Sequence, residues 1–310
     1  MPPKAPSRWK KRTLKAALAP SARSAYGGRV GKAYTVARPL LRHYRRTARP
    51  LPWRDTRDPY AVLVSEVMLQ QTQVARVVPA YRRFLRRFPT LADLGRAPLG
   101  AVLREWSGLG YNRRARALHQ IARACPDGLP TDVPSLDALP GIGAYTAGAV
   151  ACFAHRAAVP FADVNIKRVL GRIFLGRVAT DREAIALDRE HLPRRQPDVW
   201  HHALMDLGAT ICVARTPRCG ICPLAPQCKA RGRPAAIEAG IARAPRAAAY
   251  AASDRRVRGA IVRVLGNEPV GLTARALQRI IGDLRVPRLV DALVSDGLIE
   301  RAGRRLRLPL

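Results

Sequence analysis

Two carboxylic side chains stand in surroundings that suit chemistry on a bound molecule. Glu66 lies among apolar residues between Val62 and Leu69, where burial would raise its pKa and make it a proton donor near neutral pH. A lone glutamate on an exposed helix face is the simpler alternative. Asp163 lies in a short apolar segment and is followed by Asn165; it either takes part in chemistry or only caps a helix.

A glycine-containing turn precedes Asp163. The sequence LPGIGAYTAGA predicts a short helical run at 134–138, a tight turn, and an alanine-rich helix at 144–154. Gly141 and Gly143 can adopt positive φ and leave the backbone bare. Exposed N–H groups at the start of the second helix, together with its dipole, favour an anion such as phosphate. A phosphate site with a carboxylate beyond it suggests chemistry on a polyanion, and an ordinary helical turn is the alternative.

Four of the six cysteines form one loop after a predicted helix at 201–208. Their spacing is C-x6-C-x2-C-x5-C, and they are Cys212, Cys219, Cys222 and Cys228. Four thiolates can hold zinc or an iron–sulfur cluster. Zinc sites commonly use two separated C-x2-C pairs, whereas this loop has one, so we expect a [4Fe–4S] cluster and keep zinc as the alternative. Disulfides are not expected, since nothing marks the chain as secreted.

The composition indicates a polyanionic partner. The 310 residues include 55 Lys and Arg against 22 Asp and Glu, which gives a net charge of +33. Nucleic acid is the simplest partner for such a charge, although ribosomal, chromatin and membrane-surface roles also fit it. No apolar run approaches the length of a membrane span, and no secretory signal pattern is present. We therefore expect no membrane association.

The core sequence predicts an all-α fold. Asp58 and Pro59 form an N-cap and first turn for a helix that runs to about Gln70 and carries Glu66. Further helices are expected at 34–49, 74–88, 91–106 (a pair) and after the glycine turn that begins at Gly108.

Two turns of the core carry candidate DNA contacts. Leu69 to Thr72 either wedge into a minor groove or form an ordinary helix end. Tyr111 either stacks on a base or packs under its own turn.

The two ends of the chain have separate predictions. Residues 1–34 contain no acid and are expected to be a disordered basic arm that contacts phosphate, with an organelle-targeting peptide as the alternative. Residues 231–253 are expected to form a basic, alanine-rich linker. Residues 254–310 predict three helices and a hairpin, the pattern of a winged helix, which either reads a major groove or docks another protein.

Several motifs occur in one order that resembles a known family. They are LPWR (51–54), SEVMLQQTQV (65–74), GLGY (108–111), LPGIGAYTAGA (139–149) and the four-cysteine loop. This combination resembles the helix-hairpin-helix DNA glycosylase (endonuclease III) superfamily with an iron–sulfur loop. Within that superfamily, residues 35–230 most resemble the adenine DNA glycosylases of the MutY type.

The resemblance implies a base excision repair enzyme that removes adenine mispaired with 8-oxoguanine or guanine. Its two lobes would be a six-helix lobe at about 56–159 and a cluster lobe built from about 35–55 and 160–230. The partner would be double-stranded DNA that contains a mismatch, bound by a monomer. In a bacterial cell the location would be the cytoplasm, at the nucleoid.

The resemblance also assigns roles to individual residues. Glu66 would protonate the adenine ring, and Asp163 would stabilise the positive sugar as the bond breaks. Tyr145 stands where strand-cutting relatives carry a nucleophilic lysine, so we expect base removal without efficient strand cutting. The remaining assignments are Trp53, Arg54 and Asp206 near the adenine, Leu69, Gln71 and Tyr111 around the opposite base, and Gly141 and Gly143 on phosphate.

Two features depart from the family pattern. Val164 stands between Asp163 and Asn165, where Gly or Thr is usual. The winged-helix-like tail stands where familiar members carry a Nudix-like domain that recognises 8-oxoguanine. Two other functions remain as alternatives: a thymine or uracil glycosylase of the same fold acting opposite guanine, and a non-catalytic iron–sulfur DNA-binding regulator.

Overall fold

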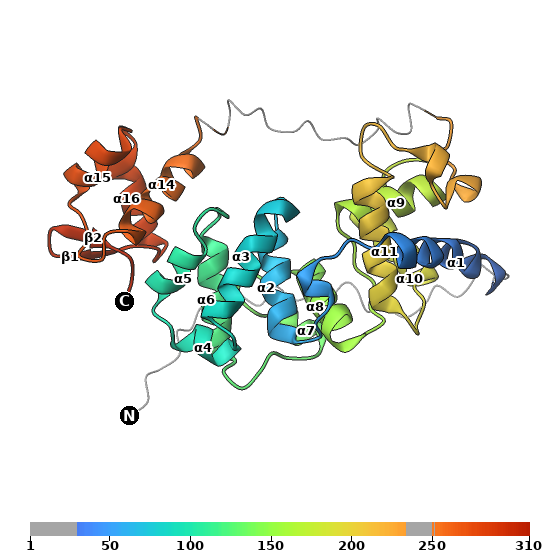
Figure 1. The fold of residues 1–310 in the computed structure, drawn as a ribbon, viewed down its shortest axis with the longest axis horizontal. Coiled ribbons are helices and arrows are strands. Elements are labelled where there is room, and N and C mark those ends of the chain that lie inside the picture. Colours follow the sequence, from blue (N-terminus) through green and yellow to red (C-terminus); the bar gives the residue numbers. More distant parts are fainter. Residues whose placement is uncertain (1–29, 234–249, 251) are drawn as a thin grey trace.

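The computed structural model describes residues 30–233, 250 and 252–310 (Figure 1). The predicted arm at 1–34 lies outside the described residues up to residue 29, and so does most of the predicted linker. The first helix, α1 (Val30–Thr47), begins four residues before the predicted start at Tyr34. Across the described residues the secondary structure is helical except for one small hairpin, so the predicted all-α class is confirmed.

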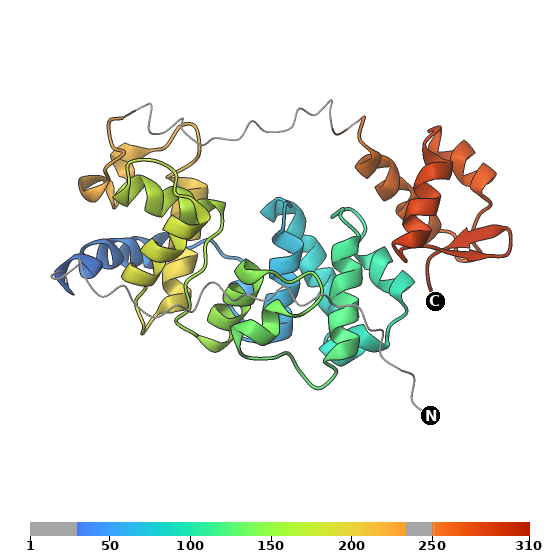
Figure 2. The same cartoon turned by 180° about the vertical axis from the view of Figure 1, so that it is seen from behind.

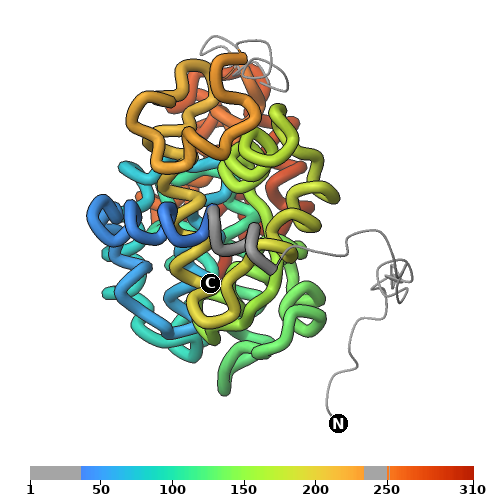
Figure 3. Tube along the Cα trace, turned by 90° about the vertical axis from the view of Figure 1, so that its right-hand side faces the viewer, coloured from blue at the N-terminus to red at the C-terminus, as the bar shows by residue number. Residues whose placement is uncertain are grey.

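The helices of the core form two groups that lie side by side in Figure 1. The first group consists of α2 (Pro59–Leu69), α3 (Val74–Arg87), α4 (Leu91–Arg96), α5 (Leu99–Glu105), α6 (Arg113–Ala124), α7 (Val133–Asp137) and α8 (Ala144–His155). The second group consists of α1, α9 (Val164–Phe174), α10 (Asp181–His191) and α11 (Pro197–Thr210). The short helix η1 (Pro52–Arg54) joins α1 to the first group. The loop after α11, with the turns η2 (Cys219–Ile221) and η3 (Ala225–Gln227), lies at one edge of the second group, on the same side of α1 in two views (Figures 1 and 3).

Helix α2 is the centre of the first group. It is apolar around its whole circumference, and every residue from Tyr60 to Met68 is buried, as expected of a helix without a polar face. Asp58 begins it by accepting hydrogen bonds from Tyr60 N at 3.0 Å and Ala61 N at 3.3 Å, as the sequence predicted. Helix α2 packs against α8, which is equally apolar. The α7–α8 hairpin lies near the middle of the molecule when it is seen from behind (Figure 2).

A buried polar network ties the connection between α8 and α9 to the second group. The carboxylate of Asp188, on α10, accepts hydrogen bonds from Trp200 Nε1 at 2.7 Å and from Phe161 N at 3.1 Å, and it lies 2.8 Å from His201 Nε2. All four residues are buried. Because each carboxylate oxygen is paired, the cost of burying this charge is offset. The network fixes the backbone two residues before Asp163.

The tail folds as three helices and a hairpin, as predicted. These are α14 (Asp254–Gly266), α15 (Ala274–Ile281), α16 (Val286–Ser295), β1 (Glu300–Ala302) and β2 (Arg305–Arg307). The strands pair antiparallel with Glu300 opposite Arg307, which gives a small winged-helix-like domain. Its last residues pack on α5, where Gly100 N donates a hydrogen bond to Pro309 O at 2.8 Å. Among the helices of the described ranges, none is long and apolar enough to cross a membrane.

Candidate active site

One cavity of about 760 Å³ lies where the two groups of helices meet. Glu66 of α2, Tyr145 of α8 and Asp163 before α9 all line it. Four more residues singled out from the sequence line the same cavity: Trp53, Arg54, Leu69 and Gln71. The fold therefore brings seven of the candidate residues to one space, and their chemical roles remain predictions.

Glu66 is buried, with 5% of its surface exposed. The simpler alternative, that Glu66 lies on an exposed helix face, is therefore wrong, because α2 has no exposed face. Burial raises the pKa of Glu66 to about 7; the hydrogen bond from Tyr145 Oη to Oε2, at 3.0 Å, opposes this shift, and the charge of Asp163 adds to it. A carboxyl group with this pKa is partly protonated at neutral pH and can act as an acid.

Tyr145 holds Glu66 in place. Burial and the two neighbouring carboxylates raise the pKa of Tyr145 well above its usual value, so its hydroxyl keeps its proton and remains a donor. Its ring packs edge-on against Phe161, with 5.6 Å between the ring centres. The tyrosine therefore fixes the Glu66 carboxyl group.

Asp163 both caps a helix and lines the cavity. It is the N-cap of α9 and accepts hydrogen bonds from Asn165 N at 2.9 Å and Ile166 N at 2.7 Å. Asn165 Nδ2 donates a third, at 2.7 Å. The simpler expectation, a capping aspartate, is therefore true, and the same carboxylate also lines the cavity. Three N–H donors hold the carboxylate in this position.

Val164 does not disturb the cap that Asp163 forms. It is the first residue of α9, and among the described residues only Gln71, Tyr111 and Arg156 are non-glycine residues with positive φ. Its side chain is 66% exposed and lines the cavity. The departure from the family pattern thus adds an apolar surface beside the carboxylate, at a position where the backbone does not require glycine.

Arg54 is held by a charge network behind the cavity wall. Asp206 accepts hydrogen bonds from Arg54 Nη1 and Nη2 at 2.8 and 2.6 Å, and from Arg49 Nε at 2.6 Å. Although burial opposes the shift, these arginines hold the pKa of Asp206 below its usual value. Asp206 itself is not among the residues that line the cavity; it positions Arg54, and its predicted place near the adenine stays a prediction. Arg49 was not predicted as a site residue, because nothing in the sequence ARPL (48–51) distinguishes it from the many arginines nearby.

His202 is a second wall residue that the sequence did not indicate. Burial and the charge of Arg54 lower its pKa to about 3, and its ring stacks on Phe153 at 4.1 Å between centres. It therefore lines the cavity as a neutral aromatic ring. Its position one helical turn before Asp206 is the only sequence signal that could have found it.

Arg114 joins the two turns that carry Gln71 and Tyr111. Its guanidinium donates hydrogen bonds to the carbonyl oxygens of Val67 and Gln70 at 2.7 and 2.6 Å, and to that of Gly110 at 3.1 Å. Burial, with the neighbouring Arg255, lowers its pKa to about 10, so it keeps its charge at neutral pH. The motif YNRRAR gave no reason to select this arginine over the others.

The three residues predicted to lie around the opposite base line two different spaces. Leu69 and Gln71 line the central cavity, whereas Tyr111 lines a neighbouring cleft, which Gln71 also lines. Gln71 and Tyr111 have φ of 54° and 49°. A non-glycine residue in this region is strained, and such strain concentrates at functional sites.

The two glycines of the α7–α8 hairpin differ in their backbone. Gly141 has φ of +72°, and a Cβ there would approach Ala117 Cβ to 2.9 Å, so only glycine fits. Gly143 is the N-cap of α8 with φ of −122°, and a Cβ there would meet nothing within 4 Å. The left-handed conformation that both glycines can adopt is therefore used only by Gly141. Both are exposed, at a helix start where phosphate can approach.

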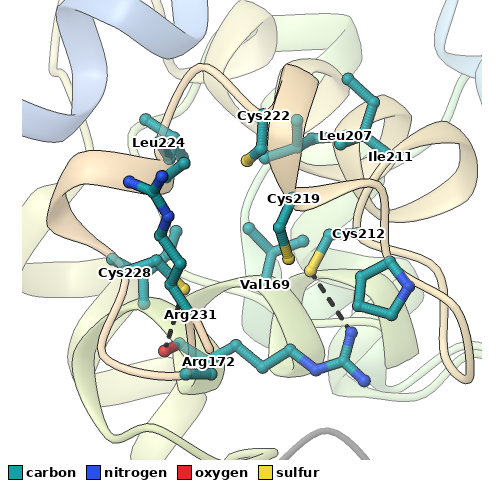
Figure 4. Close-up of a pocket in the computed structure, with 14 residues that line it drawn as sticks. Val169, Arg172, Leu207, Ile211, Cys212, Cys219, Cys222, Leu224, Cys228 and Arg231 are labelled. Carbon is teal, nitrogen blue, oxygen red and sulfur yellow. Dashed lines mark hydrogen bonds between the residues drawn. The ribbon is translucent and has the colours of Figure 1, made fainter. Parts of the chain in front are cut away.

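The four predicted metal ligands surround one space (Figure 4). Cys212, Cys219, Cys222 and Cys228 line it together with apolar side chains that include Leu207 and Leu224. Arg172 Nη1 donates to Cys212 Sγ at 3.5 Å, and Cys228 Sγ lies 3.4 Å from Arg172 O. In the part of the chain that the structure describes, no three His, Cys, Asp or Glu side chains are arranged to chelate one metal ion. The four thiols therefore lie around one shared and mainly apolar space.

Comparison with known proteins agrees with this geometry. Residues 64–193 match the family model of the HhH-GPD superfamily of base excision DNA repair proteins, and residues 212–228 match that of the iron–sulfur binding domain of endonuclease III. An adenine DNA glycosylase of Mycolicibacterium smegmatis is 43% identical over 276 residues, which cover 85% of this chain and 92% of the relative. An adenine DNA glycosylase of Mycobacterium tuberculosis is 42% identical over 277 residues, covering 84% and 89%. The human adenine DNA glycosylase is 38% identical over 212 residues, covering 63% and 39%.

Solved structures show the same core fold. A thermostable thymine-DNA glycosylase is 26% identical with a TM-score of 0.59, and the match covers 64% of this chain and 96% of that one. A trapped covalent complex of endonuclease III with DNA is 23% identical with a TM-score of 0.56, covering 64% and 95%. The two-lobed helix-hairpin-helix fold implied by the motifs is therefore confirmed.

Proposed function

The chain belongs to the HhH-GPD superfamily of base excision DNA repair proteins, among the adenine DNA glycosylases, and we propose that it removes adenine mispaired with 8-oxoguanine or guanine. It is a DNA N-glycosylase with an iron–sulfur loop. The observation that carries the proposal is the buried Glu66, whose pKa is raised to about 7, in one cavity with Asp163. The enzyme would act as a monomer on a mismatched duplex and, in a bacterial cell, at the nucleoid.

The reaction would be hydrolysis of the N-glycosidic bond. Neutral adenine is a poor leaving group, so Glu66 donates its proton to a ring nitrogen as the bond to the sugar breaks and its electron pair leaves with the base. The positive charge that develops on the sugar is stabilised by the Asp163 carboxylate. Water then adds to the sugar carbon and returns a proton to Glu66. Tyr145, 3.0 Å from Glu66 Oε2, holds the acid toward the cavity throughout.

The cavity between the lobes would receive the adenine after it rotates out of the duplex. Trp53 offers an apolar wall, and Arg54 offers N–H donors whose direction is fixed by Asp206. His202, being neutral, adds a wall without adding charge near the protonated base. The pocket thus combines flat surfaces for a purine with polar groups whose positions are fixed by hydrogen bonds.

We propose a [4Fe–4S] cluster for the cysteine loop. Cys212, Cys219, Cys222 and Cys228 would be its thiolate ligands, and the bound cluster would cross-link a loop that has little secondary structure of its own. Arg172, buried and hydrogen-bonded to Val213 O at 2.8 Å and Ala214 O at 2.6 Å, holds the loop against α9. Iron and sulfide analysis of the purified protein can check this composition and exclude zinc.

A panel of mismatched duplexes tests the proposed substrate. Purified protein is expected to release adenine from A:8-oxoguanine and A:G duplexes and to leave T:G and U:G duplexes intact. Activity confined to T:G or U:G would contradict the adenine proposal and favour the thymine or uracil alternative. Release of no base from any duplex would favour a non-catalytic regulator.

Strand cutting is expected to be inefficient. A lyase needs an unprotonated amine that attacks the sugar, and the position facing Glu66 is held by Tyr145. Among the described residues that line the cavity, Lys167 is the one lysine, and its ammonium group is engaged in an ion pair with Asp181 at 2.7 Å. Borohydride reduction during turnover should therefore trap little covalent protein–DNA adduct. A strong adduct in the wild type would contradict this proposal, and its loss in Lys167→Ala would identify the amine.

A further inference from the structure

Phe161 lies in the segment between α8 and α9, and aromatic rings from two helices enclose its side chain. Its ring stacks on His201 of α11, with 3.9 Å between the ring centres and 21° between the planes. Tyr145 and Phe153, both of α8, pack edge-on against it, each with 5.6 Å between ring centres. Only 1% of Phe161 is exposed. The ring is therefore held between α8 and α11, and it cannot move without disturbing the packing of Tyr145.

The backbone of Phe161 is held by the same buried network that supports its ring. Phe161 N donates a hydrogen bond to Asp188 Oδ2 at 3.1 Å, and this oxygen also lies 2.8 Å from His201 Nε2. The other ring nitrogen of His201, Nδ1, lies 2.8 Å from Pro197 O. Because both nitrogens have a partner, the imidazole is held in one orientation. One carboxylate therefore fixes both the main chain of Phe161 and the ring on which its side chain stacks.

Helix α8 has room for this side chain because of a glycine. A Cβ at Gly148 would approach Phe161 Cβ to 3.0 Å, so a side chain at this position would push Phe161 away. Gly148 follows Tyr145 by three residues, and residues three apart lie on the same face of a helix. Phe161 therefore packs along one face of α8, with Tyr145 beside its ring and Gly148 beside its Cβ.

Phe161 is connected to both candidate catalytic carboxylates, by different routes. Its ring contacts Tyr145, whose hydroxyl donates a hydrogen bond to Glu66 Oε2 at 3.0 Å. Its main chain leads within two residues to Asp163, the N-cap of α9. Glu66 and Asp163 belong to separate elements and line the same cavity. Phe161 thus links the segment that carries one carboxylate to the side chain that holds the other.

We propose that Phe161 is a positioning residue that sets the placement of Glu66 relative to Asp163, with Asp188 and His201 as its anchor. A displacement of about 1 Å at the reacting groups can cost about a hundredfold in rate, so a residue that does not touch the substrate can control excision. The inference rests on the proposed function of the two carboxylates. Phe161, Asp188 and His201 lie outside the motifs that indicated the site.

Phe161→Leu tests the role of the ring, because it keeps an apolar side chain and the backbone hydrogen bond. We expect the single-turnover excision rate at saturating enzyme to fall about tenfold or more, with little change in the Kd for the mismatched duplex. Phe84→Leu is the matched control: Phe84 is buried in edge-on contact with Phe88 and Trp106 and does not line the cavity. It should lose a similar amount of thermal stability and keep the wild-type excision rate.

A double-mutant cycle tests the proposed route through Tyr145. Tyr145→Phe keeps the ring that packs on Phe161 and removes the hydroxyl that donates to Glu66. Two substitutions that act on one contact have effects that do not add. We therefore expect Phe161→Leu to slow excision by less than about threefold in the Tyr145→Phe background, against about tenfold or more in the wild type.

Titration of Glu66 in the free protein gives a readout that does not depend on excision. The hydrogen bond from Tyr145 opposes the rise of the Glu66 pKa that burial and the charge of Asp163 produce. Loosening of this bond in Phe161→Leu should therefore move the pKa of Glu66 further upward, and Phe84→Leu should leave it unchanged. Carbon NMR of isotope-labelled glutamate carboxyl groups measures this pKa, with the Glu66 signal assigned by its absence in Glu66→Gln.

The inference is wrong if the two leucine variants slow excision equally, if the losses in the cycle add, or if Phe161→Leu leaves the pKa of Glu66 at its wild-type value. If the pKa shifts as expected but the wild type releases no base from any duplex, the positioning of Glu66 remains and the proposed function fails. Gly148→Ala serves if Phe161→Leu does not fold, because it pushes Phe161 away from α8. It should shift the pKa of Glu66 in the same direction, and an unchanged pKa would overturn the inference.

Discussion

Glu66→Gln is expected to reduce base release by about a thousandfold or more while leaving mismatch binding intact. Glutamine has nearly the same shape and still accepts the hydrogen bond from Tyr145 Oη, but it has no proton to donate to the leaving base. Single-turnover excision measures the loss, and anisotropy with the same duplex measures binding. Excision within tenfold of the wild type would remove Glu66 from the role of acid.

The wild-type excision rate should depend on pH through the same group. With a pKa of about 7, Glu66 is protonated below neutrality and loses the catalytic proton above it. The single-turnover rate should therefore be level at low pH and fall about tenfold per pH unit well above 7. The residual rate of Glu66→Gln should lack this decline, which separates titration of Glu66 from titration of the DNA.

The same substitution is expected to stabilise the fold at alkaline pH. The pKa of Glu66 is raised from 4.5 to about 7 in the folded protein, so the folded state binds the proton more tightly than the unfolded state. The contribution of this proton to the free energy of unfolding is fully present below about pH 4.5 and is lost as the pH rises through about 7. The total loss is up to about 3 kcal/mol. Glutamine avoids the loss. The free energy of unfolding in urea should therefore be higher for Glu66→Gln than for the wild type at pH 8 but not at pH 5. An equal difference between the two proteins at both pH values would contradict this prediction.

Local sequence signals predicted the helices because those signals are local in space as well. Asp58 and Pro59 begin α2, and Thr273 caps α15 by accepting from Ala276 N at 3.2 Å, as the patterns indicated. The left-handed conformation of Gly141 is likewise set by the turn formed by its neighbouring residues. Such features depend on a few adjacent residues, and tertiary packing does not override them.

Features that depend on distant segments could not be predicted in this way. The burial of Glu66 requires α3, α6 and α8 to cover a helix that the sequence alone could equally have left exposed on one side. Arg114 and Arg49 resemble the other arginines of a chain that has a large excess of basic residues, and only the carbonyl groups and the carboxylate brought to them by the fold distinguish them. The docking of the tail is similar: Asp296 has no local signal, yet it joins Arg113 to Arg258.

Asp163→Asn is expected to reduce excision by about a hundredfold or more with little change in stability. Asparagine caps a helix about as well as aspartate, so the bonds from Asn165 N and Ile166 N can be kept. What it removes is the negative charge that would stabilise the positive sugar, and such preorganised electrostatic contacts are worth factors of this size. Single-turnover excision and thermal unfolding measure the two effects separately.

Asp163→Ala is the matched variant, because it removes both the charge and the cap. It should lose about as much activity as the asparagine variant and, in addition, about 1 kcal/mol of stability. If Asp163 were only a capping residue, activity would follow stability: the asparagine variant would excise normally, and only the alanine variant would be impaired. The proposed role instead requires the two variants to agree in activity and to differ in stability, because one carboxylate both begins α9 and faces the cavity.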